Sequence, residues 1–145
     1  MGRATALREP SPALCQGGDT VDMKLELVPV PVSDVDRAKT FYQKIGFGGV
    51  VDVRMSDTMR VIQLTPPGAA CAIVFGTGMG EITDMEPGSV KGLHLVVADI
   101  EEARADLVGR GVEAGDVMDI GGVKYVRCAD PDGNVWLLQE WPSTS

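Results

Sequence analysis

Apolar and polar positions follow a helical period early in the chain. Four apolar residues recur at intervals of three and four positions, which predicts one buried stripe on a helix. They are Ala38, Phe41, Tyr42 and Ile45. Ser33 or Asp34 is expected to cap the start of this helix, because short polar side chains accept hydrogen bonds from its free N–H groups. Gly46 is expected to end it.

Short segments rich in apolar and β-branched residues predict strands around this helix, at 24–32, 50–55, 59–64 and 70–75. The pattern then returns, with strands predicted at 92–97, 112–118, 123–128 and 135–141. A second helix between the first two of these is capped by Asp99 and ended by Gly111. Pro29 and Pro31 cannot donate backbone hydrogen bonds, so the first strand suits the edge of a sheet.

The two halves are related by an internal repeat. A shift of 65 positions aligns them without a gap, and identical residues meet at helix caps, helix ends and turns. The pairs are Val32 and Val97, Asp34 and Asp99, Ala38 and Ala103, Gly46 and Gly111, Val61 and Val126, Pro66 and Pro131, and Gly68 and Gly133. The repeat predicts two βαβββ modules in an α+β fold. Neither module covers its sheet alone, so the two must pair with each other or across a dimer.

We therefore predict one domain over residues 23–142. It contains a first module at about 24–75, a linker at 76–90 and a second module at about 91–141. Residues 1–22 lack apolar periodicity and are expected to form a disordered or accessory tail. The linker is rich in Gly, Glu and Asp and is expected to be exposed. Its Gly76–Gly80 stretch lacks the last glycine and the following helix of a phosphate-binding loop.

Composition narrows the classes of partner. Apolar residues make up 44% and charged residues 23% of the 145 residues, as in ordinary globular proteins. No apolar stretch reaches the roughly 18 residues of a membrane span. A net charge of −8 argues against a nucleic-acid surface. The three cysteines, Cys15, Cys71 and Cys128, form no CxxC pair, which favours a reducing, cytoplasmic location over a disulfide or zinc scaffold.

Three segments resemble the vicinal oxygen chelate family, which includes glyoxalase I, bleomycin-resistance proteins and extradiol dioxygenases. They are the capped helix region 32–42, the strand region 92–100, and residues 130–140 with the sequence DPDGNVWLLQE. The likeness extends from residue 24 to about 141. It implies a tandem βαβββ fold whose curved sheet forms a cleft, and a homodimer.

In metal-using members of that family, His, Gln or Glu ligands occupy four strand positions. The resemblance places these positions at Leu27, Ala72, Gly92 and Leu137. None of these side chains can coordinate a divalent ion. We therefore expect no cofactor and no metal at the family site; a divalent metal would require a displaced site.

Several polar residues remain as candidates. His94 and Gln139 each lie two positions beyond a would-be ligand position, hence on the same strand face. They could anchor a ligand, or His94 could act as a general acid or base; alternatively, His94 is satisfied by Gln139 or by the backbone. Gln63 could face inward, and Arg127, beside Tyr125 on the same face, would select a carboxylate or phosphate if it faced the cleft.

Other side chains are expected to face away from the cleft. Glu140 and Glu26 lie one position off the inward face, and Trp136 is expected to meet the helix layer. Cys71 and Cys128 are expected to pack as small apolar groups.

These features leave three functions open. The first is a protein that binds a small organic molecule in an apolar cleft, with His94 and Gln139 as polar anchors and without a metal. The second is a lyase, isomerase or dioxygenase that uses a displaced metal or His94. The third is a scaffold whose own side chains fill the cleft. We favour the first, because it needs no metal.

Overall fold

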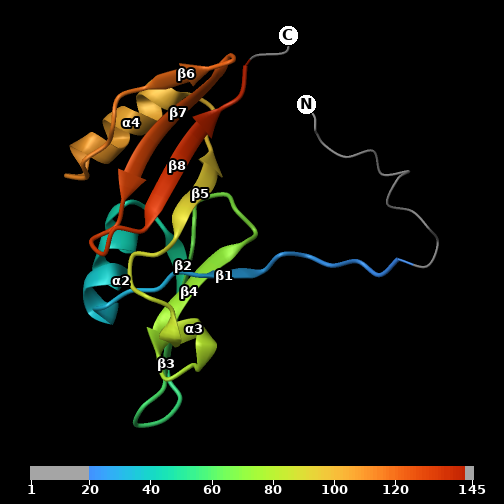
Figure 1. The fold of residues 1–145 in the computed structure, drawn as a ribbon, viewed down its shortest axis with the longest axis vertical. Helices are drawn as coiled ribbons and strands as arrows, with labels where there is room; N and C mark the ends of the chain where they lie inside the picture. Colours follow the sequence, from blue (N-terminus) through green and yellow to red (C-terminus); the bar gives the residue numbers. More distant parts are fainter. Residues whose placement is uncertain (1–19, 143–145) are drawn as a thin grey trace.

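Figure 1 shows the fold of the chain as a computed structural model, which describes residues 20–142. The first module contains β1 (Leu27–Pro29), α2 (Val35–Lys44), β2 (Gly48–Arg54), β3 (Arg60–Thr65) and β4 (Ala72–Thr77). A short helix, α3 (Glu81–Asp84), follows. The second module contains β5 (Lys91–Val96), α4 (Ile100–Gly109), β6 (Met118–Ile120), β7 (Val123–Ala129) and β8 (Val135–Glu140). Most of the predicted tail, residues 1–19, lies outside the described part.

The strands form two four-stranded mixed sheets with the same order, β1-β4-β3-β2 and β5-β8-β7-β6. In each sheet the first strand pairs in parallel with the last, and the other pairs are antiparallel. The predicted α+β class and tandem βαβββ repeat are therefore confirmed. β1 is an edge strand, as the two prolines indicate.

The predicted caps form at both helices. Asp34 accepts a hydrogen bond from the backbone N–H of Arg37, and Asp99 accepts one from that of Glu102, both at 3.0 Å. Gly46 and Gly111 follow the two helix ends with φ of 104° and 83°, a conformation that favours glycine. Ser33, the alternative cap, instead binds Asp132 of the second module.

The strand predicted at 112–118 is wrong over most of its length, because β6 covers only Met118–Ile120. An isolated bridge joins Ala114 to Cys128. The guanidinium of Arg104 on α4 donates to the Gly115 carbonyl at 2.7 Å. The backbone N–H of Gly115 donates to the Arg127 carbonyl at 2.8 Å. The Arg104 side chain thus supplies a hydrogen bond to this segment that a neighbouring strand would otherwise supply.

The first predicted strand is also shorter than expected, since residues 24–26 are exposed and outside β1. In the linker, no sequence signal predicted α3. The hydroxyl of Thr83 closes this turn by accepting from the backbone N–H of Met79 at 3.0 Å. The linker is not wholly exposed, because Gly88 is buried and its N–H donates to the Pro31 carbonyl.

A single apolar core joins the two modules on the helix-covered sides of the sheets. The predicted stripe of α2 lies in or against it: Ala38 and Tyr42 are buried, and Phe41 and Ile45 pack against them. Ile62, Leu64 and Phe75 enter this core from the first sheet, and Val126 and Leu138 from the second. Across residues 20–142, none of the helices combines the length and the apolar character of a membrane span.

Candidate functional site: the open faces of the two sheets

Each sheet has one face covered by helices and one open face. In β3, Ile62 and Leu64 are fully buried, whereas Gln63 between them is half-buried. In β7, Val126 and Cys128 are buried and Arg127 is exposed. Because successive strand residues point to opposite faces, Gln63 and Arg127 lie on the faces away from the core.

The open face of the first sheet is apolar. Across its strands, Leu27 is in register with Ala72, and Pro29 with Val74. The same rows continue from Val74 to Gln63 and from Gln63 to Val51. The Gln63 amide makes no side-chain hydrogen bond with any described residue. Gln63 is thus a single polar group in an otherwise apolar row.

The open face of the second sheet collects the predicted polar residues. One row runs from His94 on β5 to Leu137 on β8 and Arg127 on β7. The next row runs from Val96 to Gln139 and Tyr125. The rings of His94 and Tyr125 meet edge to face, with centroids 6.2 Å apart. The structure therefore brings His94, Gln139 and Arg127 together on one face and adds Tyr125, while Gln63 lies on the other sheet.

His94 is held by its own strand. Its Nδ1 lies 2.6 Å from the Gly92 carbonyl oxygen. A carbonyl only accepts hydrogen bonds, so Nδ1 carries a proton and donates. In neutral His94, Nε2 is then a free acceptor on an exposed side chain. Gln139 and the backbone were the two hydrogen-bond partners expected for His94. The partner found for its Nδ1 is the backbone.

Arg127 has no counter-ion among residues 20–142, and its guanidinium makes no hydrogen bond with them. The side chains of Tyr125 and Gln139 are half-buried and likewise have no hydrogen-bond partner in that range. Three groups able to donate hydrogen bonds therefore point toward the same open surface.

The positions that the family resemblance assigns to metal ligands lack donor side chains. Leu27 and Ala72 are register partners, and Leu137 lies beside His94. Gly92, with φ of 102°, lies at the irregularity between Lys91 and Leu93. Within residues 20–142, no three His, Cys, Asp or Glu side chains gather as a metal site would require. The donor set at these positions does not fit a divalent ion.

Glu140 faces away from this surface. Its carboxylate accepts the backbone N–H of Ile100, at the start of α4, at 2.7 Å. This confirms that Glu140 points to the helix side, so it cannot join His94 and Gln139 around a displaced ion. Trp136 also faces the helices, as predicted: it is 3% exposed and its ring contacts that of Tyr42.

Sequence reasoning missed a buried polar cluster at the junction of the modules. The hydroxyl of Tyr42 donates to Asp130 at 2.7 Å and accepts from the indole N–H of Trp136 at 2.9 Å. The amide of Asn134 donates to Asp130 and to the Pro31 carbonyl, both at 2.8 Å. Burial, together with the charge of Asp130, raises the pKa of Tyr42 far above its ordinary value. These groups satisfy one another, so we assign them a structural role.

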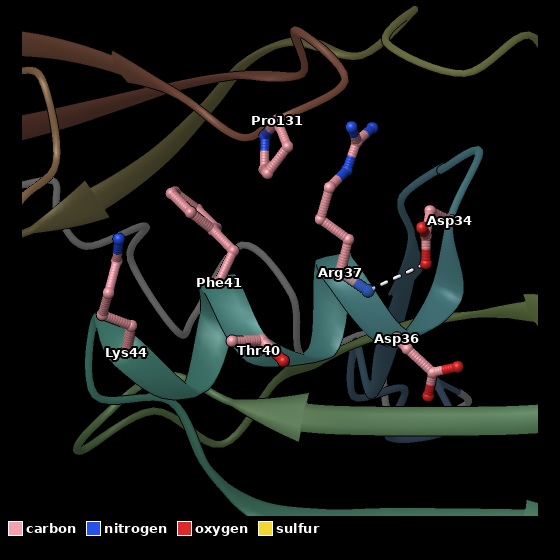
Figure 2. A pocket seen from close by; sticks show the side chains of 7 residues that line it. All are labelled: Asp34, Asp36, Arg37, Thr40, Phe41, Lys44 and Pro131. Atoms are coloured by element: carbon pink, nitrogen blue, oxygen red, sulfur yellow. Dashed lines mark hydrogen bonds between the residues drawn. The ribbon is translucent and has the colours of Figure 1, made fainter.

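In the described part of the chain, hollows lie away from the open faces. One, of about 520 Å³, runs along the outer side of α2 toward Pro131; Figure 2 shows Phe41, Lys44 and Arg37 rising beside it. The other, of about 220 Å³, lies between the modules and includes Pro66, Trp136 and Leu138 in its lining. His94 lines neither.

Of the two cysteines in the described part, Cys128 packs in the apolar core as expected, whereas Cys71 lies outside that core and just before β4. Cys128 is 4% exposed, and burial raises the pKa of its thiol to about 11. Cys71 is half-buried, and both are free thiols.

Comparison with solved structures finds the same fold. An antibiotic-binding protein, TnmS3, from Streptomyces sp. CB03234 is 31% identical with a TM-score of 0.71, over 86% of this chain and 99% of that chain. A glyoxalase/bleomycin resistance protein from the same organism is 33% identical with a TM-score of 0.66, over 79% and 98%. A superfamily member from Sphaerobacter thermophilus DSM 20745 is 30% identical with a TM-score of 0.71, over 82% and 98%.

Comparison with curated proteins gave no significant match. The sequence profile of the Glyoxalase/Bleomycin resistance protein/Dioxygenase superfamily matches residues 24–138. This span contains the first βαβββ module and all of the second except the end of its last strand, β8. The chain therefore belongs to the Glyoxalase/Bleomycin resistance protein/Dioxygenase superfamily.

Proposed function

We propose that this protein binds a small organic molecule against the open faces of its sheets, without the metal used by other members of the family. One observation carries the proposal: the open faces combine an apolar surface with a few unpaired polar groups, and the family's ligand positions hold Leu27, Ala72, Gly92 and Leu137. Ligand pockets have this general composition. The similarity to a protein described as antibiotic-binding supports the same class of function.

The site is completed by a second copy of the chain. Within one chain, the modules meet through their helix-covered sides, because the Tyr42, Asp130 and Trp136 contacts lie there. Val74 on the first open face is buried, but both open faces carry exposed apolar residues: Val51, Val53, Met118 and Ile120. A homodimer that brings these faces together would bury this apolar surface and enclose a ligand.

Binding is tested with N-phenyl-1-naphthylamine, a neutral aromatic probe that fluoresces when it leaves water. We expect saturable binding to the wild-type protein, and at least a tenfold loss in Val51→Glu, because a carboxylate enters the apolar row beside Gln63. Val108→Glu is the matched control: Val108 is an exposed valine on α4, at 51%. Equal binding by both variants, or no binding by the wild type, would overturn the proposal.

Dimerisation and metal content are measured on the same samples. Size-exclusion chromatography with light scattering is expected to give the mass of two chains. Elemental analysis is expected to show no stoichiometric transition metal. A stoichiometric ion that is lost on substitution of His94 would instead favour an enzyme.

A second candidate is an enzyme that uses His94 as a general acid or base. It is favoured by one observation, the free Nε2 acceptor on an open face. In the described part, however, no carboxylate hydrogen-bonds to the ring of His94, whose Nδ1 binds backbone. If His94→Gln retained full ligand affinity but lost conversion of a bound compound, the enzyme would be established and simple binding rejected.

A further inference from the structure

We infer that the ligand is an organic anion with an apolar body. Arg127, flanked by Tyr125, Gln139 and His94, receives its charged group, and the apolar row of the first sheet receives its body. This inference rests on the proposed function and adds the chemical class and orientation of the ligand to it.

The charge balance around Arg127 supports an anion. The chain carries 21 acidic residues against 13 basic ones, and several Lys and Arg side chains of residues 20–142 are paired with carboxylates. The pairs are Lys24 with Asp22, Arg37 with Asp132, Lys39 with Asp52, Arg60 with Asp36 and Asp52, Arg104 with Asp116, and Arg110 with Asp106. Arg127, like Lys44, Arg54, Lys91 and Lys124, has no such partner among residues 20–142. Arg127 differs in its surroundings, because it shares one sheet face with the unpaired polar groups of Tyr125 and Gln139. Its planar guanidinium suits a carboxylate, sulfonate or phosphate.

The acidic residues of the neighbouring strands face the other way. Glu140 binds the N-terminus of α4. Asp119 is in register with Lys124, and both lie opposite Arg127 in the strand alternation. The surface around Arg127 therefore carries a positive charge that no carboxylate of residues 20–142 pairs with. Two neutral neighbours, Tyr125 and Gln139, can donate to an anion there, because their polar groups have no hydrogen-bond partner in that range.

The two open faces differ in polarity, which orients the ligand. The first face holds Val51, Val61, Ala72 and Leu27 around Gln63. Of the charged residues of β2 and β3, Asp52 and Arg60 bind Lys39 and Asp36 of α2 on the helix-covered side. Arg54 lies two positions from Asp52 and hence on the same side of β2. A ligand charged at both ends, or along its whole length, would leave a charge against this apolar row at high cost.

The experiment compares two probes with the same aromatic body. They are 1-anilinonaphthalene-8-sulfonate, which is an anion, and neutral N-phenyl-1-naphthylamine. Both are titrated into the full-length wild-type protein, Arg127→Gln and Lys124→Gln. Lys124→Gln is the matched control, because it removes one positive charge from the same strand on the opposite face.

We expect Arg127→Gln to weaken binding of the sulfonate about tenfold, as the loss of one charge-assisted hydrogen bond would. Its affinity for the neutral probe should stay within twofold of wild type, and Lys124→Gln should change neither affinity by more than twofold. Tyr125→Phe should weaken only the sulfonate, by a few-fold. Circular dichroism of each variant verifies that it is folded.

Two results overturn the inference alone: equal loss of sulfonate affinity in Arg127→Gln and Lys124→Gln, or no loss in Arg127→Gln. In either case, retained binding of the neutral probe leaves the proposed function standing. Failure of the wild type to bind either probe overturns both. The two failures are therefore distinguishable in one set of titrations.

Discussion

The module junction and the open sheet faces both hold polar side chains. These side chains differ in whether they have hydrogen-bond partners within the protein. At the junction, Tyr42, Asp130 and Asn134 are buried and hydrogen-bonded to one another or to backbone. On the open face of the second sheet, Arg127 and Gln139 have no such partners within residues 20–142. A satisfied buried network holds a fold together, whereas unpaired donors on an apolar surface are available to a ligand.

The comparison is tested most strongly by Asp130→Ala. The carboxylate of Asp130 accepts from Tyr42, from the amide of Asn134 and from two backbone N–H groups. Its removal leaves buried donors unpaired and should lower the free energy of unfolding by about 3 kcal/mol. Urea denaturation measures this, with Asp57→Ala, an exposed loop aspartate, as the control. A loss below about 1 kcal/mol would show that the network is not structural.

Tyr42→Phe should have a smaller effect of about 1–2 kcal/mol, because Trp136 and Asp130 each lose one hydrogen bond. The pH dependence provides a second test. The pKa of Tyr42 is raised in the folded protein, so above the ordinary tyrosine pKa of about 10 the unfolded chain releases a proton that the folded one keeps. Stability should therefore fall as the pH rises above that value, and less steeply in Tyr42→Phe. Identical slopes would contradict the assigned environment.

The sequence predicted those parts of the molecule that depend on local signals. Asp34 and Asp99 cap their helices, and Gly46 and Gly111 follow the helix ends, because capping depends on neighbours within four residues. The alternation of strands also placed Trp136 and Glu140 on the helix side.

Long-range contacts were not predictable in the same way. The bond between Tyr42 and Asp130 joins residues 88 apart in sequence, and periodicity indicated only that Tyr42 is buried. The 112–118 strand was lost because the Arg104 side chain binds the Gly115 backbone, and alternation does not reveal such competition. Strand alternation already placed Tyr125 and Arg127 on one face. The contact between Tyr125 and His94 was not predictable, because it depends on β8 pairing with both β5 and β7.

The smallest effect is expected for Glu140→Gln. This substitution tests whether Glu140 belongs to the helix side of β8 or to its ligand-binding side. The amide oxygen can still accept from Ile100, but the negative charge at the start of α4 is lost, at about 0.5 kcal/mol. Affinity for both fluorescent probes should be unchanged, because the side chain faces the helix. Weaker probe binding, or release of a bound ion, would place Glu140 in the ligand site and contradict its assignment to the helix.

The most direct measurement is a crystal structure of the protein with bound N-phenyl-1-naphthylamine. We predict that the naphthalene ring lies on an open face, in contact with Val51 or Leu137, with side-chain atoms of the protein as its only contacts. A ring seated instead in the hollow beside Pro66 and Trp136, or a ligand held through an ion on His94, would contradict it.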